Sequence, residues 1–351
     1  MTTTSRVQLI LATVAGLAFM LITPLAVDLF TLLNLTIYVI LAILALSLGL
    51  IWGYGGILCF GQAAFYGLGA YTYAVSAINI GESTAPLLLA IALPAACAAL
   101  LGWFMFYGRL SDVYMGVITL AVTLILFKLI NATAGDQYVI GTARLNGFNG
   151  MHGVPPLNIP GNASSILLPD GLFYVCVACL LLIYLGLRWL LASHFGRVII
   201  AIRENEQRAE LLGYDVRWYK TVLFALGGAI AGLAGALFVN WGGYADPSLF
   251  SLFQSAQIII WVIVGGLGTL LGPIVGAVLI HYLTSLIGSP ELVSLLSNLL
   301  GSGRKLDSNL LLGIILVLFV LLVPRGVVPG AQHLWQRYRM KSGAGKSGDN
   351  Y

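Results

Sequence analysis

The sequence predicts an all-α polytopic integral membrane protein with about ten transmembrane helices and with both termini in the cytoplasm. Three observations predict this fold class. The 351 residues are 59% hydrophobic and only 9% charged, whereas about a quarter of the residues in an average soluble domain are charged. Apolar runs long enough to cross a bilayer recur along the whole chain. The lysines and arginines gather in alternate segments between these runs.

The apolar runs define the expected helices. A helix rises about 1.5 Å per residue, so roughly 20 apolar residues cross the hydrocarbon core. Glycines in the third run favour a broken or re-entrant helix, and the eighth and ninth runs could form one kinked unit. The predicted number therefore holds to within one or two. The ten segments are 8–27, 33–53, 57–79, 85–106, 113–134, 171–191, 221–242, 254–270, 273–288 and 308–324.

The distribution of Lys and Arg predicts the orientation. With both termini inside, twelve basic residues lie in cytoplasmic segments and three lie outside, which follows the positive-inside rule. The outside residues are Arg144, Arg304 and Lys305. The inside residues are Arg6, Arg109, Arg197, Arg203, Arg208, Arg217, Lys220, Arg325, Arg337, Arg339, Lys341 and Lys346. We expect a single transmembrane domain over 1–330, with an outer loop at 135–170, a cytoplasmic loop at 192–220 and a basic cytoplasmic tail at 331–351.

Residue types that carry catalysis or bind metals form no recognisable constellation in the sequence. The four histidines are scattered, and the four cysteines all lie in apolar runs, where buried thiols are the favoured interpretation. No predicted span holds the paired acid and base that a proton-driven carrier needs. A sodium-driven carrier built from backbone carbonyls stays open as an alternative. We therefore expect a protein that is not an enzyme and that binds no metal or cofactor of its own.

One cytoplasmic stretch, AIRENEQRAELLGYDVRWYK (201–220), concentrates charge. Eight of the chain's 30 charged residues lie in these twenty positions, with both signs present. The positive-inside rule accounts for the basic residues alone. Residues 205–212 can form about two helical turns, and Gly213 suits the left-handed position that ends a helix. A solvated connector is one interpretation; the other is an amphipathic helix that inserts into a groove on a partner, where small residues allow close approach.

Four segments resemble one known family, the permease subunits of bacterial ABC importers for branched-chain amino acids and their relatives for urea and short amides. The likeness extends over about 33–330. The segments are GYGGILCFGQAAFYGLGAY (53–71), LNGFNGMHGVP (145–155), FGRVIIAIRENEQRAELLGYDVRWYK (195–220) and ADPSLFSLFQSAQIIIWVIVGGLGTLLGPIVGA (245–277).

This resemblance implies specific partners. It implies a homologous second permease, two cytoplasmic ATPase subunits that hold ATP-Mg, a periplasmic substrate-binding protein, contact with membrane lipid and no nucleic acid. It also implies that the third segment is the loop that docks on the ATPase. The residues that match that loop are Arg203, Glu204, Asn205, Glu206, Arg208, Ala209 and Gly213, and Arg208 stands where members often have Ala.

Polar residues in two spans are candidates for the translocation pathway. Gln62, Tyr66 and Tyr71 lie in the Gly-rich third span, where an interrupted helix would expose backbone groups. Thr119 and Thr123 are four residues apart and could face the same cavity. Tight packing through small residues is the alternative for the third span. Hydrogen bonding of the hydroxyls to their own helix is the alternative for the two threonines.

A second Gly-rich stretch joins the eighth and ninth spans. Gly265, Gly266, Gly268, Gly272 and Pro273 form either a hinge or a tight cytoplasmic turn, and the turn is favoured.

The leading hypothesis from the sequence is an importer permease in the bacterial inner membrane. A urea or short-amide permease and a self-sufficient secondary carrier or channel are the alternatives.

Overall fold

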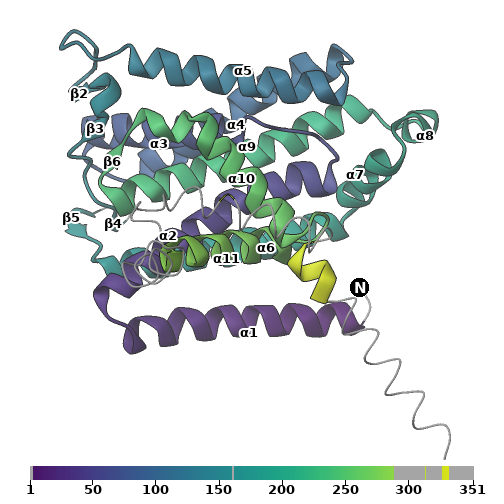
Figure 1. The fold of residues 1–351 in the computed structure, drawn as a ribbon, viewed down its shortest axis with the longest axis horizontal. Helices are drawn as coiled ribbons and strands as arrows, with labels where there is room; N and C mark the ends of the chain where they lie inside the picture. Colours follow the sequence, from purple (N-terminus) through teal and green to yellow (C-terminus); the bar gives the residue numbers. More distant parts are fainter. Residues whose placement is uncertain (1–2, 160–161, 288–312, 314–325, 332–351) are drawn as a thin grey trace, which may run out of the picture.

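The long apolar runs form a bundle of helices in the computed structural model, which describes residues 3–159, 162–287, 313 and 326–331. Most of the long helices run in roughly the same direction, side by side (Figure 1). The α-helices are α1 (Thr3–Ala26), α2 (Leu29–Leu48), α3 (Gln62–Ile80), α4 (Thr84–Tyr107), α5 (Asp112–Asn131), α6 (Pro169–Ala192), α7 (His194–Glu204), α8 (Glu206–Leu211), α9 (Val216–Gly242), α10 (Leu252–Gly265) and α11 (Leu271–Ile287).

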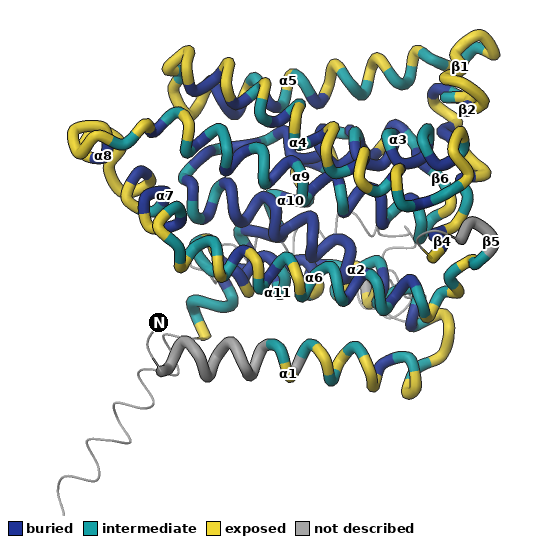
Figure 2. The backbone as a smooth tube through the Cα atoms, turned by 180° about the vertical axis from the view of Figure 1, so that it is seen from behind, coloured by how far each residue is buried: buried dark blue, intermediate teal, exposed yellow. Residues whose placement is uncertain are grey.

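The centre of the bundle is formed by α9 and α2. Helix α9 packs against α4, α3 and α2, and α2 packs in addition against α6 and α11. Figure 2 shows that these two helices are largely buried, whereas α1 and α5 lie at opposite edges, and many residues of α5 and of the described part of α1 are exposed. Aromatic rings fill the space between the inner helices: Phe224 of α9 packs edge-on against Phe65 of α3 and Phe106 of α4.

Glycines allow the central helices to approach closely. A Cβ atom at Gly69 of α3 would collide with the backbone of Gly232 in α9, and one at Gly235 would collide with the Tyr66 carbonyl oxygen. Gly232 itself faces the Ala90 carbonyl of α4. Small residues at helix crossings bring backbones into van der Waals contact, which is a main source of helix association in lipid. The glycine content of the sequence is therefore used mainly for packing.

Helix α2 does not end in a regular way. It continues into a π-helix, η1 (Gly49–Tyr54), and an irregular segment then runs to Gly61 before α3 begins. π-Helical turns are rare and occur mostly as local bulges within α-helices, frequently at functional sites. The predicted break near the third span is thus present, but it lies before α3. Gly67 and Gly69, which were expected to weaken the helix, lie inside regular helix.

Short strands lie at one end of the bundle. They are β1 (Val139–Ile140), β2 (Ala143–Arg144), β3 (Met151–His152), β4 (Asn158–Ile159), β5 (Asn162–Ile166) and β6 (Tyr244–Ala245). They form three antiparallel pairs, β1–β2, β3–β6 and β4–β5, and β3 pairs with β6 through Met151 opposite Ala245 and His152 opposite Tyr244. Two 3₁₀ turns, η2 (Gly147–Asn149) and η3 (Pro247–Phe250), flank that pair. The all-α prediction missed these ribbons, because two-residue strands carry no periodic signal.

The first nine predicted spans each fall on a helix, and the tenth (308–324) lies outside the described residues except for Gly313. Five helical segments of the described chain are long and apolar enough to cross a membrane, and they begin at Leu29, Thr84, Asp112, Pro169 and Val216. The eighth and ninth spans are two helices, not one kinked unit. The predicted tail (331–351) lies outside the described residues after position 331.

The two ends of the bundle differ in structure. The strands gather at one end, and the start of α1, α7 and α8 lie at the opposite end, which we call the α8 end (Figure 1). This grouping places the predicted outer loop and the predicted cytoplasmic loop at opposite ends. The charge distribution predicts that the α8 end faces the cytoplasm.

Candidate functional site

The charged stretch at the α8 end folds into two short helices. Ser193 caps the start of α7 by accepting a hydrogen bond from the Gly196 amide, and Asn205 caps α8 by accepting one from the Arg208 amide at 2.9 Å. The single cytoplasmic helix expected from the sequence is therefore preceded by another, α7. Ser193 followed by Val198, Ile199 and Ile202 at helical spacing is the sequence signal for α7.

The end of α8 matches the predicted stop. Gly213 has φ +88, and its amide donates to the Glu210 carbonyl at 2.9 Å. The Tyr214 amide donates to the Ala209 carbonyl at 3.3 Å. These two bonds are those of a Schellman motif, which satisfies the carbonyl groups at a helix C-terminus. The prediction that Gly213 ends the helix is confirmed.

One face of α8 packs against the rest of the chain. Ala209 is 2% exposed and packs with Val198 and Ile202 of α7 and with Val216 at the start of α9. The small side chain of Ala209 thus permits close approach within this chain, whereas the sequence suggested that it faces a partner. The cluster Val198–Ile202–Ala209–Val216 joins α7, α8 and α9 into one unit.

Two exposed leucines stand at the C-terminal end of α8: Leu211 is its last residue and Leu212 is its C-cap. Leu211 is 89% exposed and Leu212 is 71% exposed, beside the exposed Arg208 and Glu210. Sequence reasoning noted both leucines but did not select them as site residues. Their apolarity within a charged stretch was the available signal, because exposed apolar residues rimmed by polar ones mark interaction sites when they form a patch.

Ionic contacts tie this unit to the membrane helices. Lys220 of α9 forms an ion pair with Glu206 of α8 at 2.5 Å and lies over the Phe106 ring of α4. Arg217 lies over the ring of Tyr107. Helix α9 begins at Val216, where Asp215 caps it through the Trp218 amide, so Lys220, the predicted end of the cytoplasmic segment, lies within this helix.

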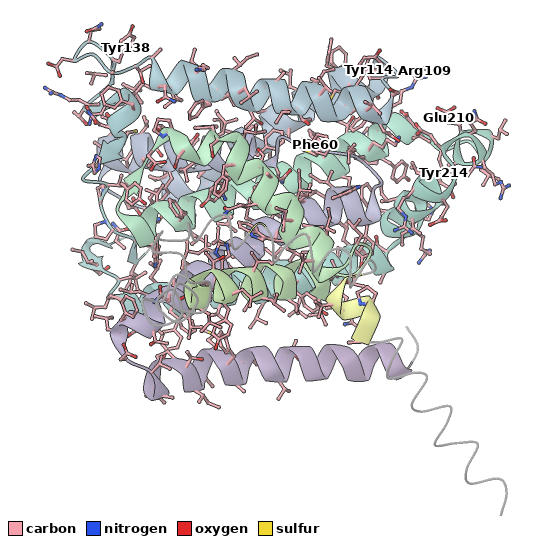
Figure 3. The ribbon with its side chains drawn as sticks, viewed as in Figure 1. Phe60, Arg109, Tyr114, Tyr138, Glu210 and Tyr214 are labelled. Atoms are coloured by element: carbon pink, nitrogen blue, oxygen red, sulfur yellow. The ribbon has the colours of Figure 1, made fainter. Side chains whose placement is uncertain are left out.

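A polar cavity of about 430 Å³ lies between α8 and the turn that joins α4 to α5. Figure 3 shows Arg109 of this turn and Glu210 of α8 at the same end of the molecule. Both signs of charge line the cavity. The charged lining residues are Arg109, Asp112, Glu206, Glu210, Arg217 and Lys220.

Arg203 and Glu204 close α7. The Arg203 side chain donates to the Gly53 carbonyl at the end of η1, with 2.6 Å between Nη1 and the oxygen, and pairs with the exposed Glu204 carboxylate at 2.6 Å. The Arg203 side chain thus points toward the membrane helices, whereas Arg208 is exposed. The predicted loop residues therefore fall into two groups. In the inner group, Arg203, Ala209 and Glu206 contact the rest of the chain, Glu206 through Lys220. In the outer group, Arg208 is exposed beside Leu211 and Leu212.

Gln62, the first residue of α3, crosslinks three helices. It is 1% exposed, and its amide nitrogen donates to Ser47 Oγ of α2 at 2.7 Å and to the Gly227 carbonyl of α9 at 3.2 Å. Buried polar groups that lack partners are costly, so this network fixes the start of α3. In this conformation Gln62 contributes helix–helix hydrogen bonds.

The two candidate threonines of α5 pack on the irregular segment before α3. Thr119 Oγ1 donates to the Gly116 carbonyl at 2.9 Å and accepts from the Phe60 amide at 3.1 Å. Thr123 Oγ1 donates to the Thr119 carbonyl at 2.9 Å. Both hydroxyls therefore bond to their own helix, and Thr119 in addition holds the segment from which Phe60 projects.

The two candidate tyrosines of α3 are both buried among aromatic rings. Tyr66 packs against Phe238 of α9, and Tyr71 packs against Phe250 of η3. The Tyr71 hydroxyl has no hydrogen-bond partner among the described residues. Of the five candidate pathway residues, Tyr71 therefore retains a buried polar atom without a partner in the described chain.

The Gly-rich junction between α10 and α11 is a tight turn. Gly266 and Gly268 have backbone φ angles of +112° and +80°, which residues other than glycine rarely adopt. Thr269 Oγ1 accepts from the Gly272 amide at 3.0 Å, so α11 begins with a capped first turn that contains Pro273. A Cβ at Gly265 would collide with the Gly272 carbonyl.

Within the described residues, no three His, Cys, Asp or Glu side chains lie close enough to hold a metal ion.

Comparisons with known proteins identify the family. A family model described as branched-chain amino acid transport system, permease component, matches residues 30–322. The high-affinity branched-chain amino acid transport system permease protein LivM of Escherichia coli K12 is 28% identical over 89% of this chain and 72% of its own length, and LivM of Salmonella typhimurium LT2 is 29% identical over the same shares.

Other relatives are named for a different cargo. The autoinducer 2 import system permease protein LsrD of Salmonella typhimurium LT2 is 28% identical over 79% of this chain and 82% of its own length. No solved structure matches the chain. The family model extends over well more than half of the sequence, and the apolar helices agree with it. The chain therefore belongs to the family of permease components of branched-chain amino acid ABC transport systems and is a multi-pass inner-membrane protein.

Proposed function

We propose that this chain is the transmembrane permease subunit of an ABC importer that moves branched-chain amino acids into the cytoplasm, driven by ATP hydrolysis in separate ATPase subunits. The match to the permease family and the LivM relatives support the role and the cargo class. The chain works without an ATPase site of its own, and ATP-Mg binds in the partner subunits.

The architecture of α8 carries the coupling part of the proposal. The helix is fixed to α7 and α9 through the buried Ala209, and its C-terminal end presents Leu211 and Leu212 to the outside. An amphipathic helix that offers apolar anchors suits insertion into a groove on a partner. In the proposed complex that partner is an ATPase subunit beneath the α8 end.

The remaining partners complete the proposed importer. A homologous second permease lies beside this chain in the bilayer, a second ATPase serves it, and a periplasmic binding protein delivers the cargo at the strand end. The β3–β6 ribbon pairs two of the motif segments, 145–155 and 245–277, at the strand end. We infer that this ribbon forms part of the surface that contacts the periplasmic binding protein. The polar cavity beside α8 adds charged groups of both signs to the ATPase-facing surface.

Reconstitution tests the proposal directly. The purified chain, its companion permease, the ATPases and the binding protein are placed in proteoliposomes, and radiolabelled leucine uptake is measured. We expect accumulation that requires ATP and every subunit. Accumulation by this chain alone, or uptake that follows a sodium or proton gradient without ATP, would refute the proposal in favour of a secondary carrier.

A competition assay tests the cargo. The LsrD relative of Salmonella typhimurium is named for autoinducer 2 import, and it has the same 28% identity to this chain as LivM of E. coli, over a smaller share of the chain. We expect unlabelled isoleucine and valine to compete with leucine, and urea, acetamide and autoinducer 2 to leave its uptake unchanged. Competition by urea or acetamide would assign the transporter to the urea and short-amide group.

A further inference from the structure

The broken end of α2 leaves one carbonyl without its helical donor. In a continuous α-helix the Ile57 amide would donate to the Gly53 carbonyl. Here the Ile57 amide donates to the Ile51 carbonyl at 3.2 Å, and the Gly53 carbonyl accepts from Arg203 Nη1 at 2.6 Å instead. A side chain that lies 150 positions along the chain therefore replaces a backbone donor at the end of the π-helix.

Three glycines surround this contact, and Gly56 leaves room for the Arg203 side chain. Gly56 has φ +67, and a Cβ there would lie 2.8 Å from Arg203 Cγ. Gly268 of the α10–α11 turn lies beneath the guanidinium, since a Cβ at that position would be 3.8 Å from Nη1. A Cβ at Gly53 would lie 3.0 Å from the Gly268 amide nitrogen. The guanidinium is thus the point at which α7, the end of η1 and the α10–α11 turn meet.

The same break is held from its other side by Gln62. Its amide links Ser47, one turn before η1, to the Gly227 carbonyl of α9. The π-helix is therefore bracketed by two side-chain contacts, one on the membrane side and one at the α8 end. Of these two contacts, the one through Arg203 comes from helix α7.

Helix α7 moves together with α8. Val198 and Ile202 of α7 pack on Ala209 of α8, and Asn205 joins the two helices with one residue. A displacement of α8 therefore carries the end of α7, and with it Arg203. The Arg203 guanidinium makes two polar contacts. Its ion pair with Glu204, whose side chain is 66% exposed, faces the solvent, and its hydrogen bond to the Gly53 carbonyl faces the membrane helices.

We propose that Arg203 is a positioning residue that transmits movement of the α7–α8 unit to the break between α2 and α3 and to the α10–α11 turn. The inference rests on the proposed function, because it needs an ATPase that moves α8. π-Helical turns occur frequently at functional sites, and the charge-assisted hydrogen bond from Arg203 to the Gly53 carbonyl, the penultimate carbonyl of η1, links the moving unit to this turn. Arg203 acts through the backbone and contacts no cargo.

The test measures coupling separately from assembly. Arg203→Gln and Arg203→Lys are compared in the reconstituted importer with Arg197→Gln, which changes an exposed arginine of the same helix α7. Three quantities are measured: ATPase subunits retained on the purified permease, ATP hydrolysis, and leucine transported per ATP. Arg203→Gln should retain the ATPases and hydrolyse ATP while leucine transported per ATP falls about tenfold, the effect of losing one charge-assisted hydrogen bond.

The other variants should bracket that result. Arg203→Lys keeps one charged donor and should recover part of the coupling. Arg197→Gln should match the parent in coupling, because the Arg197 side chain is exposed and donates to the Ala192 carbonyl beside its own helix. Gly56→Ala retains Arg203 but displaces its stem, and it should uncouple as Arg203→Gln does. Unchanged coupling in Arg203→Gln, or loss of the ATPases in proportion to the loss of uptake, would overturn the proposal. If Arg203→Gln fails to assemble, Arg203→Lys and Gly56→Ala decide the question: parent-like coupling in both contradicts it.

Failure of the proposed function has a different signature. A Leu211→Ser/Leu212→Ser double variant should retain much less of the ATPase subunits than the parent does. If that variant and the parent chain both transport leucine without ATP, the importer proposal fails, whatever Arg203 does. If the double variant loses the ATPases while Arg203→Gln transports normally, the importer proposal stands and the role of Arg203 is refuted.

Discussion

The Lys220 ammonium lies 2.5 Å from a carboxylate oxygen of Glu206, and this ion pair joins α9 to α8. The two partners differ in environment: the Lys220 side chain is 10% exposed and the Glu206 side chain is 50% exposed. Lys220 also lies over the Phe106 ring. The ammonium is thus the enclosed member of the pair, and Glu206 supplies its anionic partner from the solvent side.

Glu206→Gln should destabilise the protein. A nearly buried ammonium would lose its anionic partner, which costs about 1 kcal/mol once solvent screening of the half-exposed carboxylate is allowed for. The midpoint of thermal unfolding in detergent should fall by about 2 °C. Glu210→Gln is the matched control, since Glu210 is exposed on the same helix and forms no ion pair within the described chain. Equal shifts for both variants would contradict a structural role for this pair.

Leu211→Ser/Leu212→Ser should weaken binding of the ATPase subunits without lowering stability. Both side chains are exposed, so the free permease loses little, whereas burial of two leucines in a partner groove contributes roughly 2–4 kcal/mol. The affinity should fall by about 30-fold or more, measured by titrating labelled ATPase onto the permease in nanodiscs.

Leu168→Ser controls for the loss of an exposed leucine. Leu168 is 71% exposed and precedes α6 at the strand end, away from α8. It should leave ATPase affinity unchanged. A similar loss of affinity with Leu168→Ser would show that the effect of the double variant is not local to α8.

The extent of prediction from sequence depends on how local each feature is. The membrane helices follow from runs of apolar residues, which need no partner to be recognised. The stop at Gly213 follows from the same local logic, because a Schellman motif involves a few consecutive residues and a glycine at positive φ. Both were therefore predictable.

Other features depend on contacts between distant residues. The direction in which Ala209 points could not be inferred from a six-residue helix, since either face has too few positions to define a stripe. The contact between Arg203 and Gly53 joins residues 150 positions apart. The π-helix η1 arises where α2 meets Pro273 of α11 and the α10–α11 turn. Each is a product of tertiary packing, which a single sequence does not encode in a local pattern.

Ala209→Leu should loosen α8 from α7. The Ala209 side chain is 2% exposed among Val198, Ile202 and Val216, so three extra carbon atoms overpack the cluster at a cost of about 1–3 kcal/mol. Hydrogen exchange of the α8 amides should accelerate, and ATPase binding should fall as a consequence of the displaced leucines.

Gly213→Ala provides the comparison for Ala209→Leu. No described atom lies within 4 Å of a Cβ at Gly213, so the substitution costs only the left-handed backbone, about 1 kcal/mol. Exchange should then increase at the end of α8 and not in α7. If Ala209→Leu leaves α7 and α8 as protected as in the parent while ATPase binding is lost, Ala209 contacts the partner directly.

Gly69→Ala should destabilise the bundle core. A Cβ at this position would collide with the backbone of Gly232, so α3 and α9 would have to separate along their shared crossing. Loss of that packing costs about 2–3 kcal/mol, because a backbone neighbour cannot rotate away as a side chain can. Gly186→Ala in α6 is the matched control, since no described atom lies within 4 Å of a Cβ there. It should be neutral or stabilise the protein by about 0.5–1 kcal/mol through helix propensity. The unfolding midpoints of both variants in detergent decide the matter: equal midpoints would mean that α3 and α9 are not in backbone contact at Gly69.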